Sequence, residues 1–154
     1  MSEKAQSLVL GWGNLSRGDD ALGPLFVAGL QERLPPDLLC QVEFLDDYQL
    51  QIEFALDLVG RARILFIDAS LDCAAPYEVR CVQARRDSSI SSHALSPEAL
   101  LQVFADMQGQ AAPPATLLAI RGDAFELGEP VTASAQARLK AAVAWGLAWL
   151  QQVN

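Results

Sequence analysis

Carboxylates follow three apolar segments of this chain, where they could together bind a cation. The segments 7–10, 40–45 and 62–67 are apolar enough for buried strands, and acidic residues come after each of them. The carboxyl ends of parallel strands meet at one edge of a sheet, where α/β proteins bind ligands. We therefore expect a cation-binding edge. Its candidate residues are Asp19, Asp20, Asp46, Asp47 and Asp68.

His93 is the only histidine, and its spacing leaves its place open. It lies between an expected edge strand, 77–82, and a helix that begins after Ser96. An antiparallel strand ends at the opposite edge, so residues 84–92 would have to bring His93 back. If they do, carboxylates, one imidazole and open positions form a site that suits nickel or zinc better than a thiolate-loving ion.

Each candidate also has a purely structural interpretation. Asp19 or Asp20 can cap the first helix, Asp68 can bind backbone amides of the next turn, and His93 can be an exposed loop residue. The gathering of several carboxylates at one predicted edge favours the cation site over these interpretations.

The glycine-rich segment that begins at Gly11 raises a different alternative, dinucleotide binding. It links a strand to a helix, but the G-x-G-x-x-G pattern would need a glycine where Ser16 stands. Asp19 and Asp20 would also place like charge beside a pyrophosphate. Nucleotide binding therefore stays a weaker alternative.

The elements that must position these residues follow an α/β pattern. Strands are expected at 7–10, 40–45, 62–67, 77–82 and 115–120, and helices from Leu22, over 50–59, after Ser96 and after Thr132. The link between the third and fourth strands is too short for a parallel crossover. We predict a three-layer α/β sandwich: a twisted, mostly parallel sheet of about five strands with one antiparallel edge strand, and helices on both faces.

The composition limits which partners and which cellular compartment we expect for this protein. The 154 residues carry a formal net charge of −8, which argues against nucleic acid and anionic membranes as partners. The first six residues lack a signal-peptide core, and three widely spaced cysteines favour a reduced compartment. We expect one cytoplasmic domain over 1–154, with 1–6 flexible.

Several motifs run in order along nearly the whole chain, and together they resemble the [NiFe]-hydrogenase maturation proteases. The segments 47–50 and 91–98 look most like the subgroup that serves soluble, NAD-linked bidirectional hydrogenases. The motifs are Gly11-x-Gly13-Asn14, Gly18-Asp19-Asp20-x-x-Gly23, Asp68-Ala69, Ser92-His93-x-Leu95-Ser96-Pro97, Ile120-x-Gly122, and Gly128 before Thr132.

The resemblance implies an activity. These proteases remove a short C-terminal extension from the hydrogenase large-subunit precursor after nickel insertion. It implies that Asp20, Asp68 and His93 are the catalytic, metal-contacting side chains, with Asp20 the candidate base. Nickel would arrive with the precursor, no organic cofactor would be needed, and the protein would act as a monomer. A non-catalytic protein that checks nickel on the large subunit is the alternative.

Two departures from the family pattern bear on the site. Asp20 stands where the family often has glutamate, so its shorter side chain would need a closer metal or a bridging water. Asp46-Asp47-Tyr48-Gln49 replaces a frequent Asp-Gly-Gly-Thr, which points to a different partner specificity. Asn14, Asp46 and Gln49 are the candidate substrate-binding residues.

Overall fold

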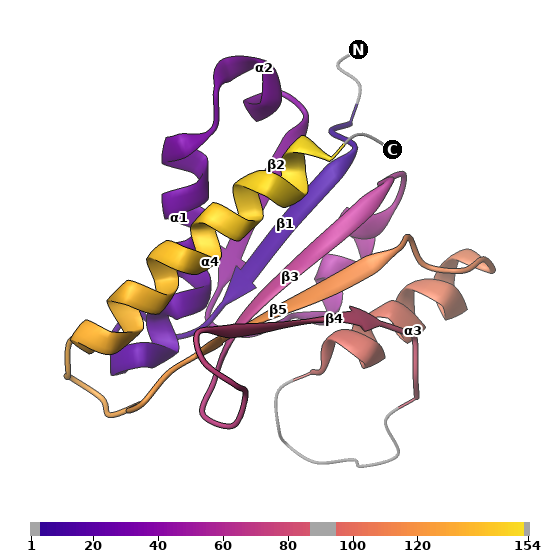
Figure 1. The fold of residues 1–154 in the computed structure, drawn as a ribbon. Coiled ribbons are helices and arrows are strands. Elements are labelled where there is room, and N and C mark those ends of the chain that lie inside the picture. Colours follow the sequence, from indigo (N-terminus) through magenta and orange to yellow (C-terminus); the bar gives the residue numbers. More distant parts are fainter. Residues whose placement is uncertain (1–3, 87–94, 153–154) are drawn as a thin grey trace.

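A twisted five-stranded sheet forms the middle layer of the molecule (Figure 1). The computed structural model describes residues 4–86 and 95–152. The strand order is β2-β1-β3-β5-β4; β4 is antiparallel to β5, and the other neighbours are parallel. The predicted α/β architecture, with one antiparallel edge strand, is confirmed. The strands are β1 (Ser7–Trp12), β2 (Val42–Asp47), β3 (Arg63–Ser70), β4 (Tyr77–Val82) and β5 (Ala115–Arg121).

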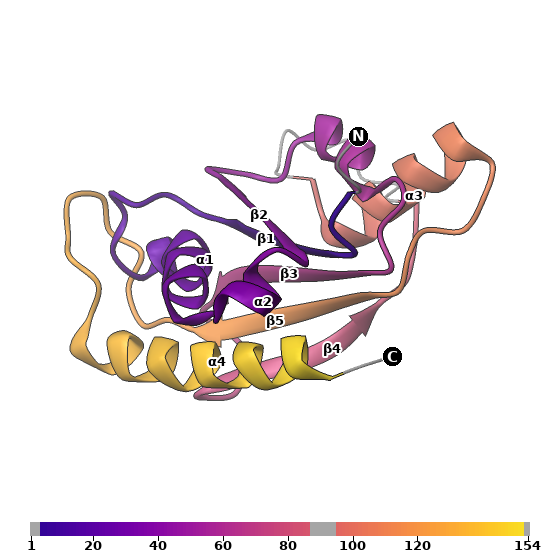
Figure 2. The ribbon, with the colours of Figure 1, turned by 90° about the horizontal axis from the view of Figure 1, so that it is seen from above.

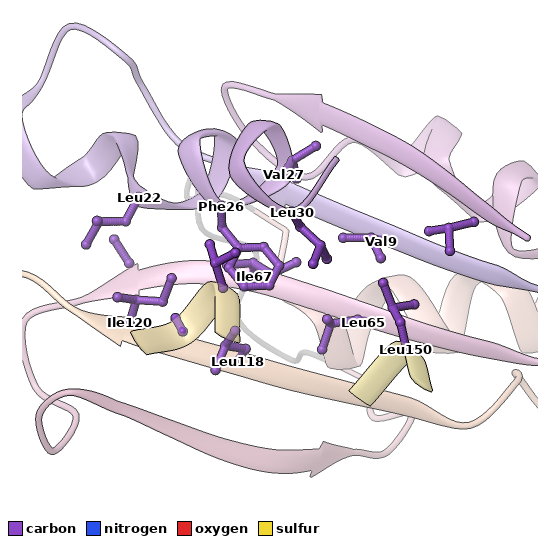
Figure 3. Packing of buried hydrophobic residues seen from close by; sticks show 14 of the residues in the cluster. Val9, Leu22, Phe26, Val27, Leu30, Leu65, Ile67, Leu118, Ile120 and Leu150 are labelled. Carbon is purple, nitrogen blue, oxygen red and sulfur yellow. The ribbon is translucent and has the colours of Figure 1, made fainter. Parts of the chain in front are cut away.

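Helices α1 (Leu22–Arg33) and α4 (Ala133–Gln151) cover one face of the sheet. Figure 3 shows Phe26 of α1 beside Ile67 of β3, with Val9 and Leu118 on neighbouring strands. Phe26 is fully buried, and burying a side chain of this size stabilises the fold by about 2–3 kcal/mol. This layer therefore holds the start of α1 firmly against the carboxyl ends of the strands.

The 3-10 helix η2 (Ile52–Leu58) and helix α3 (Pro97–Gln108) cover the opposite face (Figure 2). Ser96 caps α3 as predicted, because its hydroxyl accepts a hydrogen bond of 3.1 Å from the backbone N–H of Ala99. Phe66 of β3 and Phe104 of α3 are fully buried in this second core. The sheet is thus apolar on both faces, as a central parallel sheet should be.

Some boundaries differ from the sequence-based expectation. Strand β2 starts at Val42 and includes Asp46, which pairs with Gly11 of β1. Strand β3 continues to Ser70, so Asp68 lies inside it and pairs with Ala119 of β5. Strand β2 is shifted by two residues and β3 is extended, because ladder hydrogen bonds to a neighbouring strand outweigh the low strand propensity of aspartate.

The predicted helix over 50–59 is the short 3-10 helix η2. Helix α1 ends at Arg33, just before Pro35 and Pro36, and Pro36 then begins a further short helix, α2 (Pro36–Leu39), which the sequence did not predict. Within the described ranges, no helix has the length and apolar character to cross a membrane.

Candidate active site

The glycine-rich segment after β1 folds back on itself and brings Asp20 to the carboxyl end of the sheet. It leads into the 3-10 turn η1 (Gly18–Ala21), which runs directly into α1. Gly13 has a φ of 148°, and a Cβ there would overlap the backbone carbonyl oxygen of Asp20. The backbone N–H of Asn14 donates to Oδ2 of Asp20 over 3.0 Å. Glycine is therefore required for this close approach, which places the carboxylate beside the strand end.

Asp20 and Asp68 line the same cleft, of about 620 Å³. They come from different elements, η1 and β3, and the predicted residues Asn14 and Gln49 lie in the same wall. Among the described residues, Arg17 supplies the one cationic side chain of the lining. The lining residues are Trp12, Gly13, Asn14, Arg17, Asp20, Tyr48, Gln49 and Asp68.

A smaller cavity of about 380 Å³ adjoins the cleft and takes in Asp46. Gly13 and Tyr48 line both the cavity and the cleft, so the two spaces adjoin at these residues. Leu15 and Pro24 supply apolar surface, and Asp46 and Asp47 supply carboxylates. Asp46 is thus next to the cleft, at the end of β2, rather than beside Asp20.

Burial, together with the nearby negative charge of Asp20, raises the pKa of Asp68 to about 7. The backbone N–H of Ala69 and the side chain of Trp12 act in the opposite direction. A carboxyl group with a pKa near 7 is partly protonated at neutral pH and can both accept and donate a proton. Asp68 therefore has the electrostatics of an acid–base group.

Asp19, the neighbour of Asp20, is fully buried and faces away from the cleft lining. Its carboxylate accepts hydrogen bonds from Asp123, Ala124 and Thr132, all on the segment after β5. Burial raises its pKa, but these hydrogen bonds outweigh that effect and leave it below the ordinary value. Neither aspartate caps α1, because the cap residue is Ala21 and makes no side-chain bond.

The third predicted metal-contacting residue, His93, lies outside the described residues. Over the ranges 4–86 and 95–152 there is no group of three or more His, Cys, Asp or Glu side chains placed to hold a metal ion. Asp20 and Asp68 are two oxygen donors on one cleft, and such a pair fits a metal that brings other ligands with it.

Three lining residues, Trp12, Arg17 and Tyr48, were not among the candidate site residues. Trp12 ends β1 and packs edge-on against Phe66, with ring centroids 6.0 Å apart. The Arg17 guanidinium donates to the carbonyl oxygen of Phe125 over 3.3 Å. Trp12 and Arg17 lie within the glycine-rich segment, which was a usable signal, whereas only the fold brings Tyr48 beside Gly13.

The fold resembles that of solved hydrogenase maturation proteases. The hydrogenase maturating endopeptidase HybD from E. coli is 26% identical with a TM-score of 0.75, over 95% of this chain and 92% of that chain. The [NiFe] hydrogenase maturation protease HycI from Thermococcus kodakarensis is 20% identical with a TM-score of 0.73, over 98% and 96%. No protein-family model and no curated protein matches the sequence.

The E. coli endopeptidase, at 26% identity, supports the family that the ordered motifs suggest, and the Thermococcus protein shares the fold. A hydrogenase 2 maturation peptidase from a Thaumarchaeota archaeon also shares the fold, at 24% identity and a TM-score of 0.66, over 94% of this chain and 97% of that chain. The similarity extends over almost the full length of each chain, so it includes the elements that carry Asp20 and Asp68.

Proposed function

We propose that this protein is an endopeptidase that removes the C-terminal extension of a [NiFe]-hydrogenase large-subunit precursor after nickel insertion. The observation that carries the proposal is the pairing of Asp20 with Asp68 in one cleft at the carboxyl ends of the strands. The fold shared with a hydrogenase maturating endopeptidase supports the same activity.

In this proposal nickel is part of the substrate, and the protein recognises it. Asp20, Asp68 and His93 would add two oxygen donors and one imidazole to nickel already held by the precursor. Such a donor set suits nickel(II). Recognition through the metal would explain why a peptide bond is cut only in a precursor that has received its nickel.

Hydrolysis needs a polarised carbonyl group and a proton acceptor for the attacking water. A divalent metal can polarise the carbonyl or lower the pKa of water. The carboxylate pair takes the proton from the water and returns one to the leaving amine, for which a pKa near 7 at Asp68 is well suited. Asn14, Asp46 and Gln49 would hold the peptide on either side of the scissile bond.

The segments 47–50 and 91–98 extend the proposal to the substrate: a precursor of the soluble, NAD-linked bidirectional type. Tyr48 and Gln49 line the cleft in place of the small residues frequent in the family, so they would favour one precursor over another. Cleavage assays on this precursor and on one of a membrane-bound hydrogenase would show the preference, and equal rates would contradict it.

The test uses purified protein with nickel-loaded and nickel-free precursor, followed by mass spectrometry of the large subunit. We expect loss of the extension from the nickel-loaded precursor alone. Equal cleavage of both forms would overturn nickel recognition. Binding of the nickel-loaded precursor without cleavage would instead identify a protein that checks nickel and does not cut.

The variant Asp68→Asn tests the site itself. It should lower the cleavage rate at least about 100-fold, since it removes an acid–base group and a metal-contacting oxygen. Asp72→Asn is the matched control: it makes the same chemical change four residues later, at an exposed position outside the cleft lining. Undiminished cleavage by Asp68→Asn would show that the proposed site is wrong.

A further inference from the structure

A buried carboxylate joins the turn that carries Asp20 to a segment more than a hundred residues away. Oδ2 of Asp19 accepts from the backbone N–H of Asp123 over 2.8 Å and of Ala124 over 3.3 Å, and from the Thr132 hydroxyl over 2.8 Å. Oδ1 accepts from the backbone N–H of Thr132 over 2.7 Å. Asp19 is 0% exposed, so all of these bonds are shielded from water.

Backbone hydrogen bonds extend the same contact on both sides of Asp19. The segment 122–132, which links β5 to α4, lies along the turn, and each of these bonds crosses between the two. The bonds run from Gly18 N to Glu129 O, 3.0 Å; from Asp19 N to Ala124 O, 2.9 Å; and from Gly128 N to Ser16 O, 2.7 Å.

The segment 122–132 is in turn tied to α4. The Thr132 hydroxyl accepts from the backbone N–H of Ala135 over 3.2 Å and so caps the helix. The Asp123 carboxylate contacts Arg138 at 3.1 Å and the hydroxyl of Ser134. A continuous set of bonds therefore runs from α4, through Thr132, to Asp19.

None of the residues of the segment 122–132 lines the cleft, and Asp19 does not line it either. The segment therefore reaches the site indirectly, through the turn η1 and through Arg17, which lines the cleft and donates to the carbonyl oxygen of Phe125. The turn is only four residues long and its cap residue, Arg17, makes no side-chain cap bond. External bonds are what hold it in one orientation.

We propose that Asp19 and Thr132 are positioning residues, which clamp η1 so that the Asp20 carboxylate faces Asp68 across the cleft. This inference deepens the proposed function and rests on it for its activity readout. The clamp acts on the geometry of the carboxylate pair, and misplacement of a reacting group by about 1 Å can lower a rate about 100-fold.

Gly122 offers an independent way to disturb the clamp. A Cβ at this position would lie 2.9 Å from Cβ of Asp19 and 2.8 Å from the ring of Phe125. Gly122→Ala therefore pushes on Asp19 and leaves its carboxylate chemically intact. We expect Gly122→Ala to lower the cleavage rate in the same direction as a change at Asp19 itself.

The main variant is Asp19→Asn, which keeps the shape of the side chain. It replaces one acceptor oxygen with an amide NH2 group, which is itself a donor and cannot accept the bonds that this oxygen receives. At a temperature where the variant is fully folded, we expect kcat for precursor cleavage to fall about 100-fold, with KM changed much less. The control is Glu43→Gln, the same chemical change in the ion pair with buried Arg61 at the opposite end of the sheet. Equal loss of kcat in both variants would reduce Asp19 to a stabilising role and overturn the proposal.

Position 132 provides a rescue test. Thr132→Ser keeps the hydroxyl that donates to Asp19 and should leave kcat near that of the unmodified protein. Thr132→Val is similar in shape but has no hydroxyl, and it should reproduce the loss of Asp19→Asn. If Thr132→Val cleaves as fast as Thr132→Ser, the hydroxyl has no positioning role.

A readout that needs no substrate separates this inference from the proposed function. The backbone N–H of Asn14 donates to Asp20, so its hydrogen-exchange rate, measured by NMR, reports the place of that carboxylate. We expect faster exchange in Asp19→Asn and Gly122→Ala, and no change in Glu43→Gln. Unchanged exchange in the first two would overturn the clamp. If the unmodified protein cleaves no precursor, the proposed function fails while this measurement still decides the clamp.

Discussion

At the scale of single residues, the aspartates Asp19 and Asp68 have opposite environments. Asp19 is buried among hydrogen-bond donors that stabilise its charge, and its pKa is lowered despite burial. Asp68 is half-buried in the cleft next to the negative charge of Asp20, and its pKa rises to about 7. The first environment stabilises the fold, whereas the second costs stability and prepares a proton-transfer group.

The raised pKa of Asp68 makes stability depend on pH. The folded protein keeps the Asp68 proton up to about pH 7, but the unfolded chain loses it near pH 3.8. The unfolded state therefore binds fewer protons between these values, and the contribution of Asp68 to the free energy of unfolding falls as pH rises through this window. The total change is at most about 4 kcal/mol.

Urea denaturation of Asp68→Asn and of the unmodified protein at pH 5 and pH 8, in the presence of a chelator, checks this. We expect the variant to lose less stability between the two pH values and to be the more stable of the pair at pH 8. Identical changes with pH in the two proteins would contradict the raised pKa. Asp72→Asn, at an exposed position, serves as the control.

At the scale of elements, hydrogen bonds to other parts of the chain hold helix α4 at both of its ends. Thr132 caps its first turn and is bonded to Asp19. At its other end the Arg63 guanidinium donates to the carbonyl oxygens of Trp149 and Leu150, over 2.8 and 3.1 Å. A cation at the carboxyl end of a helix also favours the helix dipole. The helix is therefore a fixed support for the segment 122–132.

Replacing Arg63 with methionine should lower the free energy of unfolding by about 2–3 kcal/mol, because charged hydrogen bonds to two carbonyl groups are lost. The contact of the guanidinium with the Trp149 ring, 4.0 Å from its centroid, is lost as well. Hydrogen exchange in the last turn of α4 should speed up, and exchange at Asn14 should stay unchanged. Chemical denaturation gives the stability, with Arg85→Met at an exposed position as control.

At the scale of the whole molecule, two separate cores hold the sheet from its two faces. One lies under α1 and α4 and includes Phe26; the other lies under η2 and α3 and includes Phe104 (Figures 2 and 3). The site lies at the strand ends between them, supported by both layers. The two cores stabilise the fold, and this offsets the free-energy cost of the partly buried Asp68 carboxyl group at the site.

Truncating either core should destabilise the molecule without touching the cleft. Phe26→Ala and Phe104→Ala should each lower the free energy of unfolding by about 3–5 kcal/mol, since both rings are fully buried. Guanidinium denaturation measures this, and cleavage in the cold, where the variants remain folded, should be retained. A much smaller loss for one ring would mean that its layer is not part of the cooperative core.

The sequence by itself determined the elements and the motif that carries the site. The apolar run 62–67, the caps at Ser96 and Thr132, and the glycine-rich link between β1 and α1 all depend on residues a few positions apart. Periodicity, capping and link length are local, so the α/β class, the antiparallel edge strand and a set of candidate aspartates could be predicted from them, and the resemblance to a known family narrowed that set to Asp20 and Asp68.

Only the tertiary structure decided the strand order β2-β1-β3-β5-β4, the place of Tyr48 and the partners of Asp19. The sequence allows Asp19 to cap the first helix, but its bonds instead reach residues 123–132. No local pattern encodes such a contact. The raised pKa of Asp68 could not be predicted from the sequence either, because burial and the distance to Asp20 exist only in the folded molecule.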